Sequence, residues 1–181
     1  MADTEVQHSG GTTVAQFLSV NGIEVQALGH DDAAQLGIVA AVPAGWQTLP
    51  EGRFPGATSV LVEPGLVENG FAPNAVLLVG RLSAPVDSTS LLDCSFTDAR
   101  VMPGWNEGVS NAENLGGWPA RFIRGSFTAE QLELAVTTRY AVVGSPEQYL
   151  VQLTVTFLAH HADRLEFDVA VINDGLIQPV R

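Results

Sequence analysis

Lysine is absent from this sequence of 181 residues, and its eight arginines are scattered singly along the chain. Twenty acidic residues outweigh them, which gives a formal net charge of −12. Proteins that bind nucleic acids or anionic membrane surfaces use clusters of lysine and arginine against the phosphates. We therefore expect neither a nucleic acid nor an anionic lipid surface as a partner.

Cysteine and long apolar runs are also scarce. Cys94 is the only cysteine, so no disulfide can form within the chain. No apolar run reaches the roughly 18 to 20 residues that cross a bilayer, and no membrane span is predicted. Residues 1–11 are polar and acidic, without the apolar region of a signal peptide or a cysteine for lipid attachment. We expect a mobile polar leader there and a cytoplasmic protein.

Motifs for catalysis are missing as well. The 18 glycines form no phosphate-binding P-loop, no G-x-G-x-x-G after a strand and no G-x-S-x-G elbow. Cys94 falls in the middle of a predicted helix, where a cysteine usually behaves as a small apolar residue rather than a nucleophile. The sequence predicts a protein that is not an enzyme and needs no cofactor.

The sequence is strongly apolar, with 46% hydrophobic and 15% charged residues. Residues 12–181 are predicted to form a single domain with one core. Apolar residues at helical spacing predict helices that begin at Thr12 or Thr13, at Asp87-Ser88 and at Asp163. Runs rich in β-formers and turn signals predict strands at 23–27, 38–42, 59–63, 75–82, 120–129, 132–143 and 148–159.

This order of elements predicts an α+β fold. We expect a single twisted, mostly antiparallel sheet of about six strands, flanked by two or three helices. The residues at 29–32 and 144–147 are typical of turns.

Three tryptophans lie in junctions rich in proline and glycine. Trp46 follows Pro43-Ala44-Gly45, Trp105 follows Pro103-Gly104, and Trp118 lies between Gly116-Gly117 and Pro119. An aromatic side chain at such a place either seals the end of the core or lines the mouth of a groove. The apolar loop with Leu66, Val67 and Phe71 is a possible second wall. The predicted ligand-binding residues are therefore Trp46, Phe71, Trp105 and Trp118.

The motif His160-His161-Ala162-Asp163 combines residue types that bind metals. Adjacent residues are expected to point in different directions, Asp163 is well placed to cap the last helix, and the sequence suggests no third ligand. No metal site is predicted on this basis. A small enzyme or metal-binding protein that uses His160, His161 and Asp163 remains the alternative.

Several short motifs follow one another along the chain: Asn21-Gly22-Ile23, Pro43-Ala44-Gly45-Trp46, the strand at 75–82, Pro103-Gly104-Trp105 and Val171-Ile172-Asn173-Asp174-Gly175. Taken in this order, they resemble the LpqN/LpqT family of mycobacterial cell-envelope proteins. The resemblance implies an α/β/α sandwich like that of PsbP. It also implies a non-enzymatic role in the cell envelope, with a glycolipid or a protein as partner, whereas the family's lipoproteins are exported.

The leading hypothesis is a binding or adaptor domain. It would present an apolar groove or a sheet face to a lipid, a glycolipid or a protein partner. An apolar patch could also form a homodimer interface, and a structural subunit of a larger assembly is a further alternative.

Overall fold

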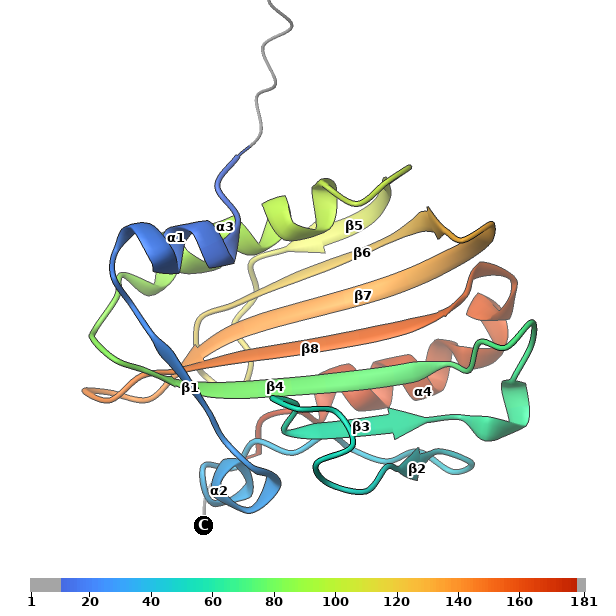
Figure 1. Cartoon of the computed structure of the whole chain (residues 1–181), viewed down its shortest axis with the longest axis horizontal. Helices are drawn as coiled ribbons and strands as arrows, with labels where there is room; N and C mark the ends of the chain where they lie inside the picture. The colour runs from blue at the N-terminus through green and yellow to red at the C-terminus, as the bar shows by residue number, and fades with distance from the viewer. Residues whose placement is uncertain (1–10, 179–181) are drawn as a thin grey trace, which may run out of the picture.

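The computed structural model describes residues 11–178, in which eight strands form one antiparallel sheet (Figure 1). The strands are β1 (Val25–Ala27), β2 (Gln47–Thr48), β3 (Ser59–Val62), β4 (Asn74–Leu82), β5 (Asn106–Asn111), β6 (Ala120–Ala129), β7 (Leu132–Val143) and β8 (Tyr149–Leu158). The α-helices are α1 (Val14–Val20), α2 (His30–Gln35), α3 (Ser88–Arg100) and α4 (Ala162–Asp174). Two short 3₁₀ helices are η1 (Pro64–Leu66) and η2 (Ala159–His161).

The sheet has the order β2-β3-β4-β8-β7-β6-β5, and β1 pairs with the end of β4 that β3 leaves free. The long strands β6, β7 and β8 form a meander, as the sequence predicts. Its short connections favour antiparallel pairing of consecutive strands. The predicted α+β class and antiparallel sheet are thus confirmed, with more strands than the expected six.

The helices cover opposite faces of the sheet. Ala141 on β7 packs into the core beneath α4, whereas its neighbours Tyr140 and Val142 pack with α1 and α3. Because successive side chains of a strand point to opposite faces, these two cores lie on the two sides of one sheet. The larger core, beneath α4, includes the fully buried side chains Leu61, Leu77, Leu153, Phe157, Leu165 and Ile172.

Helix starts follow the local capping signals. Asp87 accepts the backbone N–H of Ser90 at 3.1 Å and caps α3, as predicted. At α1, the side chains of Thr13 and Gln16 form a reciprocal capping box. The start of α4 was predicted wrongly, because its N-cap is His161 and Asp163 lies within the first turn.

Two other predicted elements differ from the structure. The segment 38–42 is not a strand: Ile38 makes one isolated bridge to Ile177, and its side chain is buried in the core beneath α4. The residues at 29–32, predicted as a turn, begin α2. The predicted leader at 1–11 lies outside the described residues except for Gly11. Within 11–178 we find no helix with the length and apolar character to cross a membrane.

Candidate functional site

Asp98, on the inner side of α3, fixes the position of α1. Its Oδ1 accepts the backbone N–H of Val14 at 2.9 Å, and its Oδ2 accepts the hydroxyl of Tyr140 at 2.8 Å. The N–H groups of a helix's first turn have no partner within the helix, so this contact satisfies one of them. The carboxylate therefore joins α1, α3 and β7.

Tyr140 keeps its proton under ordinary conditions. Burial raises the pKa of its phenol far above the usual value of 10.0, and the negative charge of Asp98 raises it further. The hydroxyl therefore remains a hydrogen-bond donor to the carboxylate.

Strand β1 borders the same space as α1. It pairs with β4 so that Ala27 faces Gly80, and a Cβ at Gly80 would overlap the side chain of Val25. The glycine thus lets Val25 lie close over β4.

A pocket of about 290 Å³ lies between α1, β1 and the sheet. Most of its wall is apolar, and Val25 and Leu78 remain 43% and 37% exposed. The lining residues are Val14, Ala15, Leu18, Val25, Ala27, Gly56, Leu78, Val79, Gly80, Asp98, Tyr140, Leu150 and Gln152. We call this space the α1 pocket.

The α1 pocket has the size and the apolar wall to hold an apolar group. An apolar cavity of roughly 150 Å³ is large enough to hold benzene, so this one has room for a longer hydrocarbon. Asp98 is the only carboxylate in its wall, and both of its oxygens already accept hydrogen bonds.

Three other cavities, of about 190, 320 and 300 Å³, have ionisable side chains in their walls. They include His30 and Glu51 in the first, Asp32 and Arg81 in the second, and Glu113, Arg124, Arg139, Glu166 and Asp174 in the third. The α1 pocket is the most apolar of the four, which makes it the candidate site for an apolar ligand.

The aromatic residues predicted to bind a ligand line none of these four cavities. Trp46 is 5% exposed within the core beneath α4, and its indole N–H donates to Asp168 Oδ2 at 3.0 Å. Trp118 packs against the same core and pairs with Leu115. Of the two roles that the sequence allowed for these tryptophans, packing against the core fits both positions better than lining a groove.

The other two predicted residues lie elsewhere. The ring of Trp105 packs over Gly125, where a Cβ would overlap it, and its N–H approaches Glu107 at 3.4 Å. Phe71 forms a two-way backbone bridge with Glu68. The structure does not bring the four residues together in a described cavity, and their ligand-binding role stays a prediction.

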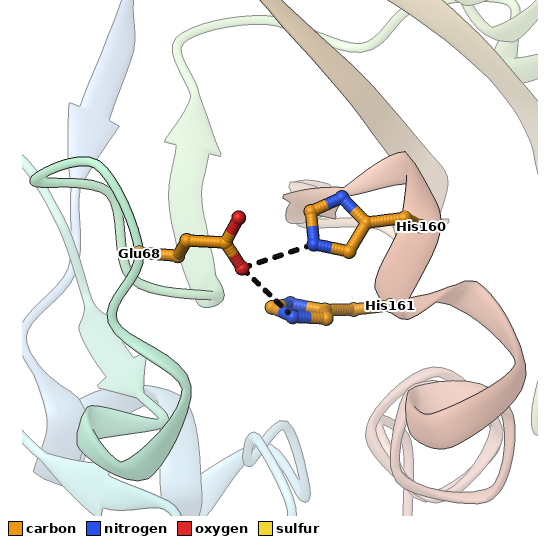
Figure 2. Close-up of side chains that lie close together, drawn as sticks. All are labelled: Glu68, His160 and His161. Carbon is orange, nitrogen blue, oxygen red and sulfur yellow. Dashed lines mark hydrogen bonds and ion pairs between the residues drawn. The ribbon is translucent and has the colours of Figure 1, made fainter.

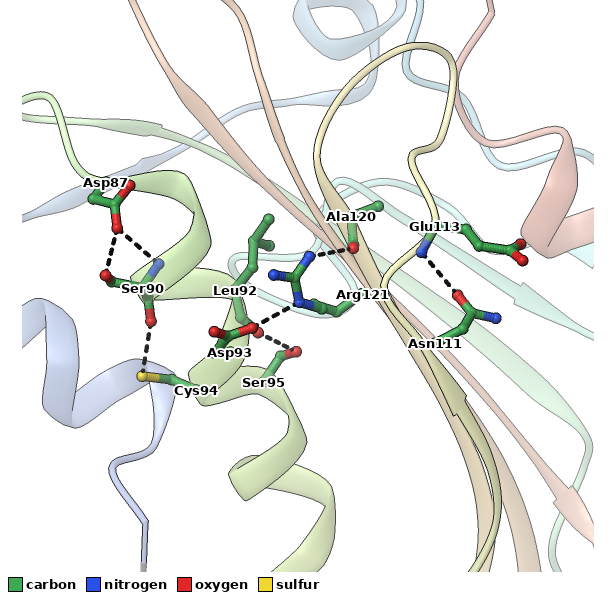
Figure 3. A network of polar contacts seen from close by, with 10 residues as sticks. All are labelled: Asp87, Ser90, Leu92, Asp93, Cys94, Ser95, Asn111, Glu113, Ala120 and Arg121. Atoms are coloured by element: carbon green, nitrogen blue, oxygen red, sulfur yellow. Dashed lines mark hydrogen bonds and ion pairs between the residues drawn. The ribbon is translucent and has the colours of Figure 1, made fainter.

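Cys94 occupies the middle of α3, as predicted (Figure 3). Its thiol contacts the carbonyl of Ser90 at 3.3 Å. Burial, followed by the charges of Asp98 and Asp93, raises the pKa of the thiol above 9.0. A thiol with a raised pKa is a weaker nucleophile at neutral pH. In the same view Arg121 on β6 donates to Asp93 at 2.8 Å and ties α3 to the sheet.

The sequence suggested that the side chains of His160 and His161 point in different directions, but the structure shows otherwise. Both imidazoles face the carboxylate of Glu68 (Figure 2). The third group of this cluster is therefore Glu68, whereas the alternative considered from the sequence combined the two histidines with Asp163. Sequence reasoning missed Glu68 because 92 residues separate it from His160.

A family model described as "Probable lipoprotein LpqN" matches residues 11–177. The chain belongs to the LpqN family. This confirms the resemblance seen in the sequence. The lipoprotein LpqT of Mycobacterium leprae is 25% identical over 166 residues, which cover 90% of this chain and 74% of that protein. Lipoprotein LpqN of Mycobacterium tuberculosis is 26% identical over 165 residues, covering 90% and 69%.

Solved structures support the LpqN fold. The crystal structure of LpqN, described as involved in cell envelope biogenesis of Mycobacterium tuberculosis, has a TM-score of 0.80 and 24% identity. The match covers 93% of this chain and 99% of that one. The solution structure of cyanobacterial PsbP from Synechocystis has a TM-score of 0.51 and 12% identity, covering 83% and 90%. The relatives' names describe lipoproteins and specify no reaction.

Proposed function

We propose that this LpqN-family domain binds an amphiphilic molecule and holds its hydrocarbon part in the α1 pocket. The observation that carries the proposal is the apolar wall formed by α1, β1 and β4, in which Leu78 and Val25 are partly exposed. Apolar area removed from water contributes roughly 25 cal/mol per Å². A hydrocarbon chain that covers these side chains gains affinity in this way.

The head group of the ligand is expected to be uncharged and to carry hydroxyl groups, as in a glycolipid. The chain has a net charge of −12, and Asp98 is the carboxylate of the pocket wall. Both features disfavour an anionic head group. The amide of Gln152 can donate and accept hydrogen bonds beside the apolar wall, which suits a hydroxyl group.

We also propose that the domain serves the cell envelope rather than catalysing a reaction. Support comes from the LpqN relative, which is described as involved in cell envelope biogenesis. A glycolipid ligand would fit such a role. The cellular location of this chain, and its binding to a protein partner or to a second copy, remain predictions.

Isothermal titration with octyl glucoside below its critical micelle concentration tests the proposal. This probe combines an uncharged sugar with a hydrocarbon chain. We expect saturable binding to the wild-type protein and binding at least about tenfold weaker for Leu78→Asn, because a polar amide would replace an apolar wall residue. The matched control is Phe167→Asn, at a side chain on α4 that is 77% exposed on the other face of the sheet.

Wild-type protein that binds no octyl glucoside would contradict the proposed ligand class. Equal losses in Leu78→Asn and Phe167→Asn would contradict the location. If octyl glucoside does not bind but the protein forms a dimer or captures a purified envelope protein, the apolar surface serves protein association instead.

A further inference from the structure

The β8–α4 junction and the loop after η1 meet through three side chains (Figure 2). His160 and His161 end the short helix η2, and Glu68 reaches them from the turn that it forms with Phe71. The two N–H···O bonds between Glu68 and Phe71, both 2.9 Å, hold that turn in shape. Glu68 is therefore presented by a defined backbone.

The three side chains place their ligand atoms around one point. Glu68 Oε2 lies 3.0 Å from His160 Nε2 and 3.4 Å from His161 Nε2. One ligand atom from each residue lies within 4.8 Å of the other two. Atoms bound at 2.0–2.1 Å in a tetrahedral arrangement are roughly 3.4 Å apart. The two distances from Glu68 are close to this value.

The kinds of ligand atom select the class of ion. Two imidazole nitrogens and one carboxylate oxygen suit Zn²⁺ and its neighbours, whereas Mg²⁺ and Ca²⁺ prefer oxygen ligands alone. An ion can reach the cluster, because the side chains of Glu68 and His160 are 45% and 59% exposed. That of His161 is 14% exposed, which gives the site one well-packed ligand.

We propose that Glu68, His160 and His161 bind a divalent transition-metal ion of the zinc class, with water in the fourth position. The ion would join the turn after η1 to the start of α4, two segments that lie 92 residues apart along the chain. An ion that binds the folded state and not the unfolded chain raises stability by mass action. The site is independent of the α1 pocket and of its ligand.

The surroundings of His161 limit the affinity. Its Nδ1 is buried and has no hydrogen-bond partner among the described residues. In high-affinity metal sites, the ring nitrogen that does not bind the metal donates its N–H to an acceptor. Loss of that acceptor weakens metal binding roughly 10- to 100-fold. We therefore expect weaker binding than at a site with a complete outer shell.

The test uses the full chain and two metals. Metal-free protein is titrated with Zn²⁺ by calorimetry and with Co²⁺ by visible absorption, which reports tetrahedral coordination. The variants Glu68→Gln and His160→Gln change exposed side chains, so they are expected to fold. The matched controls are Glu166→Gln and His30→Gln, which change an exposed glutamate and the histidine at the start of α2.

We expect one equivalent of metal in the wild type and both controls, with a rise in the melting temperature on adding Zn²⁺. In Glu68→Gln and His160→Gln, affinity should fall at least tenfold and the rise in melting temperature should disappear. The proposal is overturned if the wild type binds no stoichiometric metal. It is equally overturned if Glu68→Gln and His160→Gln bind metal as the wild type does.

Discussion

Tyr140 on β7 donates its hydroxyl to Asp98 on α3 at 2.8 Å, and the same carboxylate caps α1 through the N–H of Val14. This contact joins both helices on one face to the sheet. Both residues also line the α1 pocket. The wall of the proposed ligand site therefore includes this hydrogen bond.

Replacing Tyr140 with phenylalanine should lower the free energy of unfolding by roughly 1.5–3 kcal/mol, because the bond has a charged acceptor and lies in a buried site. Urea unfolding at neutral pH measures this loss. An unchanged midpoint would show that the bond between Tyr140 and Asp98 adds no stability.

The raised pKa of Tyr140 also predicts alkaline destabilisation. The unfolded chain releases the phenol proton near its ordinary pKa of 10.0, while the folded protein retains it. Above pH 10 the unfolded state binds fewer protons, so stability falls as the pH rises, by about 1.4 kcal/mol per pH unit from this group. The share of the slope that comes from Tyr140 should be lost in Tyr140→Phe, while the raised pKa values of Cys94 and Tyr149 keep a smaller slope of the same sign. A wild-type unfolding free energy that is constant above pH 10 would contradict this reading.

Gly80 and Val25 should be coupled. A Cβ at Gly80 overlaps Val25, so Gly80→Ala is expected to cost roughly 1–3 kcal/mol of stability through overpacking. Adding Val25→Ala should recover a large part of that loss, because the overlapping methyl groups are gone. A double-mutant cycle by urea unfolding measures the coupling, and strictly additive effects would argue against the close approach of β1 to β4.

Arg100 should control the titration of Glu107. Hydrogen bonds from Arg100, at 2.7 and 2.9 Å, lower the pKa of Glu107 from 4.5 to about 2. The stability from this contact is present above about pH 4.5 and is lost as the pH falls through 2. In Arg100→Met the pKa should rise toward 4.5, while the weaker contacts from Trp105 and Ser110 remain. Carboxyl NMR titration measures it, with Arg124→Met as the control.

Several elements could be predicted because their signals are local. The alternating apolar residues and turn signals of 120–143 gave the bounds of β6 and β7, and Asp87 marked the start of α3. Strand β5 was missed, since most of its residues are polar and exposed, and its strand conformation depends on pairing with the distant β6. The strand predicted from the apolar run 38–42 was wrong, because those residues pack beside the end of α4 instead of joining the sheet.

The candidate sites were harder to predict, because each is formed by residues distant in the sequence. The apolar face of α1 was recognised, but its pocket needs Leu78 and Gln152 from strands far along the chain. The carboxylate beside His160 comes from Glu68 in a separate loop. No local pattern carries that information.

An uncharged amphiphile is proposed to bind between α1 and the sheet. Backbone amide NMR during titration with octyl glucoside tests this binding, because each shifted signal has a known place in the structure. We expect shifts concentrated at Val14, Leu18, Leu78 and Gln152, with Phe167 unchanged. Shifts centred on Trp46, Trp105 or Trp118, or no saturable shifts at all, would contradict it.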